Sequence, residues 1–300
     1  LWGLFADYSD VMPEKDLGWI QFFIEGNQEC LDTIIQAYKV AEDKRVLLPV
    51  MVNLDGFYLS HSSEPVMIPD QKDVDDFLPP YGAEHLILDP TTRFQTLGMS
   101  MPGPRFHTTY VRFVEEAMNA SKEVIAEVDK EFYEKFGRSY GGLIEKYKCE
   151  GADVVLVTMG SMTTAARRSV DELRKNGENV GLIRLRTLRP FPSVELQEVA
   201  EEVKAMGVVD RAFLHGIGKG MAFADIAVAL SNAKQRPLLL NFIAGLGGKD
   251  IKVEDFKYMA RKVLKAAETG ETENTVFLED CEAVKKFSPP PAPPVVIRDR

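Results

Sequence analysis

The strongest constraint in this chain is an alternation of apolar runs and amphipathic segments between residues 150 and 269. Each run is short and continuous, as in Val154-Val155-Leu156-Val157, and apolar residues at helical spacing follow it. Continuous runs are typical of parallel strands that helices cover on both faces. We therefore expect an open, mostly parallel sheet, that is, a doubly wound α/β domain. Strands are predicted at 152–158, 180–185, 208–209 with extension through 214, and 238–243, and helices at 162–175, 194–206, 221–233 and 253–267.

The first 106 residues contain a single strand–helix–strand unit. An aromatic and β-branched run at 18–24 precedes a helix that we expect Asn27 to cap, and a second strand is predicted at 46–52. Two parallel strands are fewer than a stable sheet needs. The rest of this sheet is therefore expected from an alpha segment upstream of Leu1 or from another chain. The missing initiator Met fits the expectation that the chain is incomplete as a functional unit.

The remaining segments are an irregular stretch, a helix and a tail. Prolines recur between residues 53 and 108 without periodicity, and helical spacing returns from Thr108 to Phe136. A run of prolines at 288–294 is typical of an extended tail without a core. The predicted fold class is α/β, with an incomplete parallel-sheet domain over 1–106, a connecting helix within 107–149, the doubly wound domain over 150–269 and a proline-rich tail over 270–300.

Charge and cysteine usage exclude several classes of function. The formal net charge of −10 disfavours nucleic acid and anionic membranes as partners, because both surfaces are negative. The thiols Cys30, Cys149 and Cys281 are too far apart in sequence for a metal or iron–sulfur motif. No run reaches the ~18 apolar residues of a membrane span. We expect a cytoplasmic protein with no metal site of its own.

Two turns that join a strand to a helix could bind an anion. Gly160, Ser161 and Thr164 begin a predicted helix, where backbone N–H groups and hydroxyls could hold a phosphate or a CoA group. Ordinary helix capping by Ser161 or Thr163 explains the same residues. Lys219 could add a positive charge from the second turn, although the glycine spacing there does not match a dinucleotide-binding motif.

Three arginines lie within six residues before a Pro-Phe-Pro sequence. Arg184, Arg186 and Arg189 could face carboxylates or phosphates of a ligand. A salt-bridged interface between two parts of the chain explains them equally well. The sequence pattern leaves both alternatives open.

Several short motifs, in the same order, resemble the alpha subunit of pyruvate:ferredoxin oxidoreductase and related 2-oxoacid enzymes. The resemblance covers roughly residues 1–265. Its first part is similar to the end of the pyrimidine-binding domain, and its second part is similar to the transketolase C-terminal domain. Where the family commonly has arginine-aspartate-threonine-glycine, this chain has Lys15-Asp16-Leu17-Gly18, which leaves the substrate class open. The motifs include Asp7-Tyr8-Ser9-Asp10, Gly18-Trp19-Ile20-Gln21, Asp55-Gly56-Phe57, Ser60-His61, Met159-Gly160-Ser161, Arg189-Pro190-Phe191-Pro192 and Gly245-Leu246-Gly247-Gly248.

The resemblance implies a reversible reaction of a 2-oxoacid with CoA that gives an acyl-CoA, CO2 and reduced ferredoxin, with pyruvate as the favoured substrate. It implies thiamine diphosphate and Mg at an interface with a beta subunit. It also implies [4Fe-4S] clusters in partner chains, and gamma- and delta-type subunits in the complex. The family's activating glutamate and substrate arginine belong to an earlier part of the domain, so no catalytic residue is expected in this chain.

The resemblance places Leu4, Phe5 and Asp7 next to the cofactor. The alternative for these residues is a structural turn with a buried Phe5. The alternative for the whole chain is a non-catalytic interaction or regulatory module, which kept the α/β scaffold and lost the cofactor.

Overall fold

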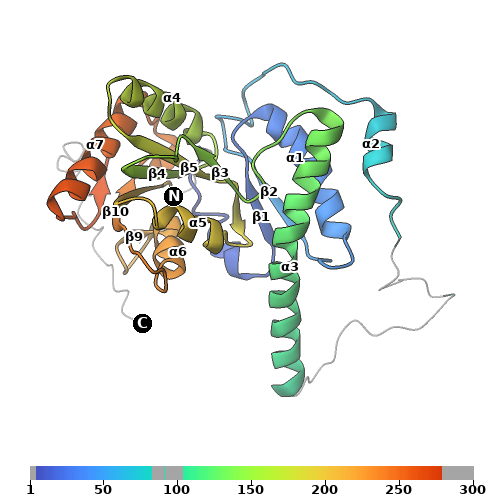
Figure 1. Ribbon diagram of the computed structural model, residues 1–300. Helices are drawn as coiled ribbons and strands as arrows, with labels where there is room; N and C mark the ends of the chain where they lie inside the picture. The colour runs from blue at the N-terminus through green and yellow to red at the C-terminus, as the bar shows by residue number, and fades with distance from the viewer. Residues whose placement is uncertain (1–4, 83–90, 92–103, 279–300) are drawn as a thin grey trace, which may run out of the picture.

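The computed structural model describes residues 5–82, 91 and 104–278 of the chain. A three-stranded sheet and a six-stranded sheet lie next to each other, with helices around both (Figure 1). Buried residues form one apolar core around each sheet. The α/β class expected from the sequence is confirmed.

The first sheet is built on the predicted strand–helix–strand unit. Strand β1 (Ile20–Phe23) is parallel to β2 (Val50–Asn53), and helix α1 (Asn27–Glu42) connects them. Two details of the prediction are wrong. Gly26 rather than Asn27 is the N-cap of α1. The second strand begins at Val50, because Pro49 has no N–H to donate to the ladder.

A third strand of this sheet comes from far along the same chain. Strand β6 (Thr187–Arg189) pairs antiparallel with β1, through Gln21 opposite Arg189 and Phe22 opposite Thr187. The expectation that further strands must come from outside this chain is therefore wrong for this one. All four residues of β1 are buried between β2 and β6.

The irregular stretch contains helix α2 (Gln71–Phe77) and ends where α3 (Pro104–Phe136) begins, four residues before the predicted Thr108. A 3₁₀ helix at Pro13–Asp16 precedes β1. The C-terminal half of α3 packs against α1 and α2, and its N-terminal half extends away from the body (Figure 1). The buried apolar residues of that C-terminal half are Val124, Ile125, Val128 and Phe132.

The second sheet follows the predicted alternation closely. Helix α4 (Met162–Lys175) and strands β5 (Val180–Leu185) and β10 (Leu238–Ile243) have the predicted bounds. The other main elements are β4 (Val154–Met159), α5 (Ser193–Ala200), β7 (Ala205–Asp210), α6 (Met221–Ala229) and α7 (Val253–Thr269). Smaller elements are β3 (Ile144–Tyr147), the hairpin of β8 (Phe213–Leu214) and β9 (Lys219–Gly220), a 3₁₀ helix at Leu246–Gly248, and β11 (Val276–Phe277).

Two helices of this sheet were predicted too long. The predicted helix 221–233 ends at Ala229. The predicted helix 194–206 ends at Ala200, and Ala205 and Met206 already belong to β7. The residues between the two elements, Glu201-Glu202-Val203-Lys204, contain no glycine or proline and continue the helical spacing, so the sequence carries no stop signal before β7. The division into 1–106, 107–149, 150–269 and 270–300 stays a prediction. Strands β3 and β11 add residues from outside 150–269 to this sheet.

The strand order β11-β10-β7-β4-β5-β3 contains a topological switch point, where the order of strands along the sheet reverses. From β4 the chain moves through α4 to β5 on one side, and then crosses back to β7 on the other side. Helices α4 and α7 pack together on one face, and α5 and α6 pack together on the other. In open α/β sheets, the crevice at the carboxyl ends of the two strands at such a switch point is where ligands bind. Here those strands are β4 and β7.

Candidate functional site

The crevice at the switch point is filled by side chains from the first part of the chain. Gly160 and Ser161 follow β4, and Arg211 follows β7. Tyr8 and Asp55 reach them across more than 100 residues of sequence. The site is therefore made by the two sheets together.

Asp55 takes the position that an anion would occupy. Its Oδ2 atom accepts hydrogen bonds from the backbone N–H of Ser161 at 2.9 Å and from Nη1 of Arg211 at 2.8 Å, and the Ser161 hydroxyl donates to the same oxygen. Asp55 is 4% exposed and Arg211 is 2% exposed. A buried ion pair with a helix N-terminus therefore joins the two parts of the chain.

Tyr8 closes the same crevice from the other side. Its N–H donates to the carbonyl of Arg211 at 3.1 Å, and its hydroxyl donates to the carbonyl of Met159 at 3.2 Å. Burial, reinforced by the charge of Asp55, raises the pKa of the Tyr8 hydroxyl well above its usual value. The phenol therefore remains a hydrogen-bond donor at physiological pH.

The predicted anion-binding residues do not form one site. Gly160 and Ser161 lie at the crevice, but Asp55 already occupies the position of the anion. Thr164 lies one helical turn further on, and its hydroxyl donates to Glu25 at 2.9 Å. Lys219 lies elsewhere, where its ammonium donates to the side-chain oxygen of Asn274 at 2.6 Å. The capping alternative does not hold either, because Ser161 is the N-cap of α4 without a side-chain capping bond.

An aromatic stack lies on the surface beside this crevice. The rings of Phe5 and Phe57 are stacked with centroids 4.6 Å apart, and Phe57 is stacked on the ring of His61 at 4.3 Å. Tyr58, the residue after Phe57, ties this segment to the glycine turn after β10. Its hydroxyl donates to the carbonyl of Gly248 at 2.9 Å. Phe57 has a φ of +62°, which is an uncommon conformation for a bulky residue and is held by its surroundings.

The residues predicted to lie next to the cofactor can be placed only in part. Phe5 is 53% exposed, which contradicts the alternative of a buried Phe5. Asp7 accepts a hydrogen bond from the backbone of Ser9 at 2.9 Å. Leu4 lies outside the described residues.

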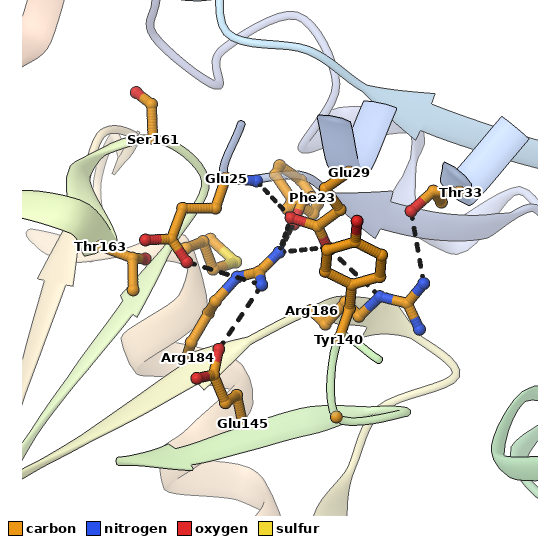
Figure 2. Close-up of polar contacts among 12 residues, drawn as sticks. Phe23, Glu25, Glu29, Thr33, Tyr140, Glu145, Ser161, Thr163, Arg184 and Arg186 are labelled. Atoms are coloured by element: carbon orange, nitrogen blue, oxygen red, sulfur yellow. Dashed lines mark hydrogen bonds and ion pairs between the residues drawn. The ribbon is translucent and has the colours of Figure 1, made fainter. Parts of the chain in front are cut away.

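The three arginines of the sequence motif make salt bridges. Arg184 and Arg186 lie on either side of Glu29, which is 3% exposed (Figure 2). Arg184 also donates to the carbonyl of Phe23 at 3.2 Å, while Arg186 donates to the side-chain oxygen of Gln36 at 2.9 Å. Arg189 binds Asp16 and Asp225 instead. Of the two alternatives, the structure contains the salt-bridged interface.

A cleft of about 820 Å³ opens between the two sheets next to this cluster. Glu25 and Glu145 lie on its wall, and Arg167 binds both, with nitrogen–oxygen distances of 2.6 Å (the two glutamates also flank Arg184 in Figure 2). These carboxylates pair with cations of the protein. We therefore treat the cluster as part of the interface between the sheets.

Sequence reasoning found Gly160 and Ser161 but missed the other residues that make the crevice. Asp55 and Tyr8 lie within motifs that carried the family resemblance, but nothing in the pattern connected them to Arg211. Among the described residues, no group of three or more His, Cys, Asp or Glu side chains could hold a metal ion. Over the same residues, no helix is long and apolar enough to cross a membrane.

Comparison with known proteins confirms the resemblance found in the sequence. The family "Pyruvate flavodoxin/ferredoxin oxidoreductase, thiamine diP-bdg" matches residues 2–130, and "Pyruvate:ferredoxin oxidoreductase core domain II" matches residues 152–256. The pyruvate synthase subunit PorA of Pyrococcus furiosus is 40% identical over 91% of this chain and 68% of its own length. The chain belongs to the pyruvate:ferredoxin oxidoreductase alpha-subunit family.

Two further relatives show the range of this family. The PorA subunit of Methanocaldococcus jannaschii is 44% identical over 88% of this chain and 66% of its own length. The ketoisovalerate oxidoreductase subunit VorA of Pyrococcus horikoshii is 38% identical over 92% of this chain and 68% of its own length. The chain thus spans about two thirds of these relatives.

A solved structure has the same fold. The 2-oxoglutarate:ferredoxin oxidoreductase from Magnetococcus marinus superposes with a TM-score of 0.52 at 16% identity, over 82% of this chain and 42% of the other. At this identity the similarity concerns the fold alone.

Proposed function

We propose that the chain works in the cytoplasm as part of the alpha subunit of a thiamine-diphosphate-dependent pyruvate:ferredoxin oxidoreductase. The reaction converts pyruvate, CoA and oxidised ferredoxin to acetyl-CoA, CO2 and reduced ferredoxin, and it is reversible. The observation that carries the proposal is the stack of the exposed Phe5 on Phe57, in the segment that matches the thiamine-diphosphate-binding family.

The aromatic stack fits the ring part of such a cofactor. Phe5 offers an exposed aromatic surface, and planar heteroaromatic rings stack on such surfaces at centroid distances of about 4.5–7 Å. The part of the chain that the structure describes does not offer an evident diphosphate site, because the anion position at α4 is taken by Asp55 and the chain carries a net charge of −10. We infer that the diphosphate and its Mg are held by a beta subunit.

The roles of the chain's own residues follow from this arrangement. Thiamine diphosphate, when bound, supplies the electron sink that makes decarboxylation of a 2-oxoacid possible. Phe5 and Phe57 limit the space available to the ring and exclude water from one of its faces. Asp7 lies two residues from Phe5, and Leu4 precedes Phe5. Both remain candidate neighbours of the cofactor.

The remaining components are assigned to partner chains. We infer that beta-, gamma- and delta-type subunits carry the [4Fe-4S] clusters and the ferredoxin contact, and that an alpha segment upstream of this chain supplies the activating carboxylate. Pyruvate is favoured as the substrate because the pyruvate synthase relatives reach 44% identity, against 38% for the ketoisovalerate relative.

Purification of the complex tests the proposal. The full-length subunit should co-purify with partner chains, thiamine diphosphate and iron–sulfur clusters, and the complex should reduce a viologen dye when pyruvate and CoA are present. The chain alone should not. Ketoisovalerate and 2-oxoglutarate serve as controls for the substrate. Partners that co-purify without cofactor or clusters would instead support the non-catalytic module.

A variant tests the aromatic stack directly. Phe57→Ala removes the central ring, and we expect it to raise the apparent KM for thiamine diphosphate by about tenfold, the factor that 1.4 kcal/mol produces. Tyr258→Ala, which truncates a 48% exposed aromatic residue on α7, is the matched control. Equal KM values in the two variants would contradict the role of the stack.

A further inference from the structure

The crevice at the switch point has the parts of an anion-binding site, yet a carboxylate of the chain itself binds there. The site combines the backbone N–H of Ser161, which is the N-cap of the 14-residue helix α4, with the hydroxyl of Ser161 and the buried guanidinium of Arg211. Backbone N–H groups at a helix N-terminus together with a cation are a common arrangement for binding phosphates and carboxylates. Asp55 satisfies all three groups with one oxygen atom.

Arg211 depends on this carboxylate for its charge balance. Its guanidinium lies over the ring of Tyr58 at 5.0 Å, and among the ion pairs of the described residues Asp55 is its acidic partner, at 2.8 Å. The charge of an arginine persists in proteins, because its pKa is too high for deprotonation. Removal of the carboxylate would leave a buried cation without compensation.

The ion pair is connected to two rings of the aromatic stack, those of Phe5 and Phe57. On the Asp55 side, the carbonyl of Asp55 accepts hydrogen bonds from the N–H groups of Leu59 at 3.0 Å and Ser60 at 3.3 Å, which fixes the turn that presents Phe57. On the Arg211 side, the carbonyl of Arg211 accepts the N–H of Tyr8, three residues after Phe5.

We propose that Asp55 is a positioning residue, which binds the anion site at the switch point as an internal ligand and thereby holds Phe5 and Phe57 in the stacked arrangement. The contact with the cofactor rests on the proposed function. The role as internal ligand does not, and it can be tested without measuring activity.

Carboxylate rescue tests the internal ligand. In the Asp55→Ala variant of the full-length subunit within its complex, we expect hydrogen exchange of a peptide covering residues 5–12 to become about tenfold faster, because local opening costs less. A peptide covering β10 reports global stability and should be unchanged. Sodium acetate, compared with sodium chloride at equal ionic strength, should restore most of the protection in the variant and have no effect on the wild type. Equal exchange in acetate and chloride would overturn the proposal.

Two further variants make the result independent of misfolding. Asp55→Asn fills the crevice without a charge, so exchange of residues 5–12 should again be faster, but acetate should not slow it. In the double variant Asp55→Ala with Arg211→Met, the acetate effect should disappear because the cation is gone. An acetate effect that persists in the double variant would contradict the assigned site.

The kinetics of the complex test the positioning role. Asp55→Asn should raise the apparent KM for thiamine diphosphate by about tenfold while kcat changes less than about twofold, and Asp55→Glu, which keeps the charge, should recover part of the KM. An unchanged KM would overturn the positioning role. If the wild-type complex shows no activity with any 2-oxoacid, the proposed function fails, while the acetate experiment still decides whether Asp55 is the internal ligand.

Discussion

At the scale of single residues, Gly160 lies where a side chain has no room. Its φ is +62°, and a Cβ atom would lie 2.2 Å from the Tyr8 hydroxyl. We expect Gly160→Ala to lower the free energy of unfolding by about 2–4 kcal/mol, from backbone strain and overpacking together. Gly177→Ala is the control, because Gly177 has a φ of +85° with nothing within 4 Å and should lose only about 1 kcal/mol. Urea unfolding of both variants measures the difference, and equal losses would contradict the clash.

Asp210 should make the stability of the protein depend on pH. Burial raises the pKa of its carboxyl to about 7, although the N–H groups of Ala222 and Phe223 and the amide of Asn241 oppose the shift. The folded state therefore retains a proton that the unfolded state releases above about pH 4. Stability should fall as the pH rises from about 4 to 7, by up to a few kcal/mol.

Asp210→Asn isolates this contribution from the other titrating groups. Between pH 4.5 and 8, the urea midpoint of the wild type should fall relative to that of the variant. Parallel curves for the two proteins would show that the carboxyl of Asp210 is ionised in the folded state over the whole range.

The sequence located some residues of the site but could not assemble them. Gly160 and Ser161 were found because a glycine and a hydroxyl at the start of a helix form a local pattern. Asp55 and Arg211 are 156 residues apart, and their pairing depends on how two sheets meet. No local pattern carries that information.

At the scale of elements, the contact of α1 with β5 depends on a buried ion pair. Glu29→Gln leaves Arg184 with Glu25 and Glu145 at 3.6 Å, which are longer contacts. We expect a loss of about 3 kcal/mol, at the lower end for a broken buried pair. The exposed pair Lys130–Glu134 on α3 is the control, and Glu134→Gln should cost at most about 0.5 kcal/mol.

A double-mutant cycle separates the ion pair from the packing around it. Glu29→Leu combined with Arg184→Met should cost clearly less than the sum of the two single changes, because no buried charge is left alone. Additive losses would mean that the two side chains contribute independently.

The accuracy of the predicted elements followed the strength of their local boundary signals. Helix α4 was predicted to the residue, because Asn176-Gly177 ends it and a polar stripe covers its outer face. Helix α5 was overextended into β7 because Glu201-Glu202-Val203-Lys204, the residues between them, are helix formers with an apolar Val203 that continues the helical spacing. Strands β3, β6 and β11 are two to four residues long and lie at sheet edges, so they lack a periodicity of their own.

At the scale of the whole molecule, the two sheets should unfold together. Both tryptophans of the chain, Trp2 and Trp19, lie in the first part, so their fluorescence reports that part alone. Far-UV circular dichroism reports mainly on the helices of the whole chain. We expect the two urea transitions to coincide, because β6, Asp55 and Glu29 connect the sheets. An earlier fluorescence transition would show that the first sheet unfolds separately.

Strand β6 also determines when the first sheet can be completed during synthesis. A chain leaves the ribosome from its N-terminus, and domains made of consecutive residues can fold as they emerge. Here β1 has one free edge until Thr187–Arg189 has been made, long after β2 is available. Over that interval the nascent chain exposes one unpaired edge of β1, in which three of the four residues are apolar. Chaperone binding to β1 during translation, followed by release once β6 has emerged, is the behaviour that this strand order favours.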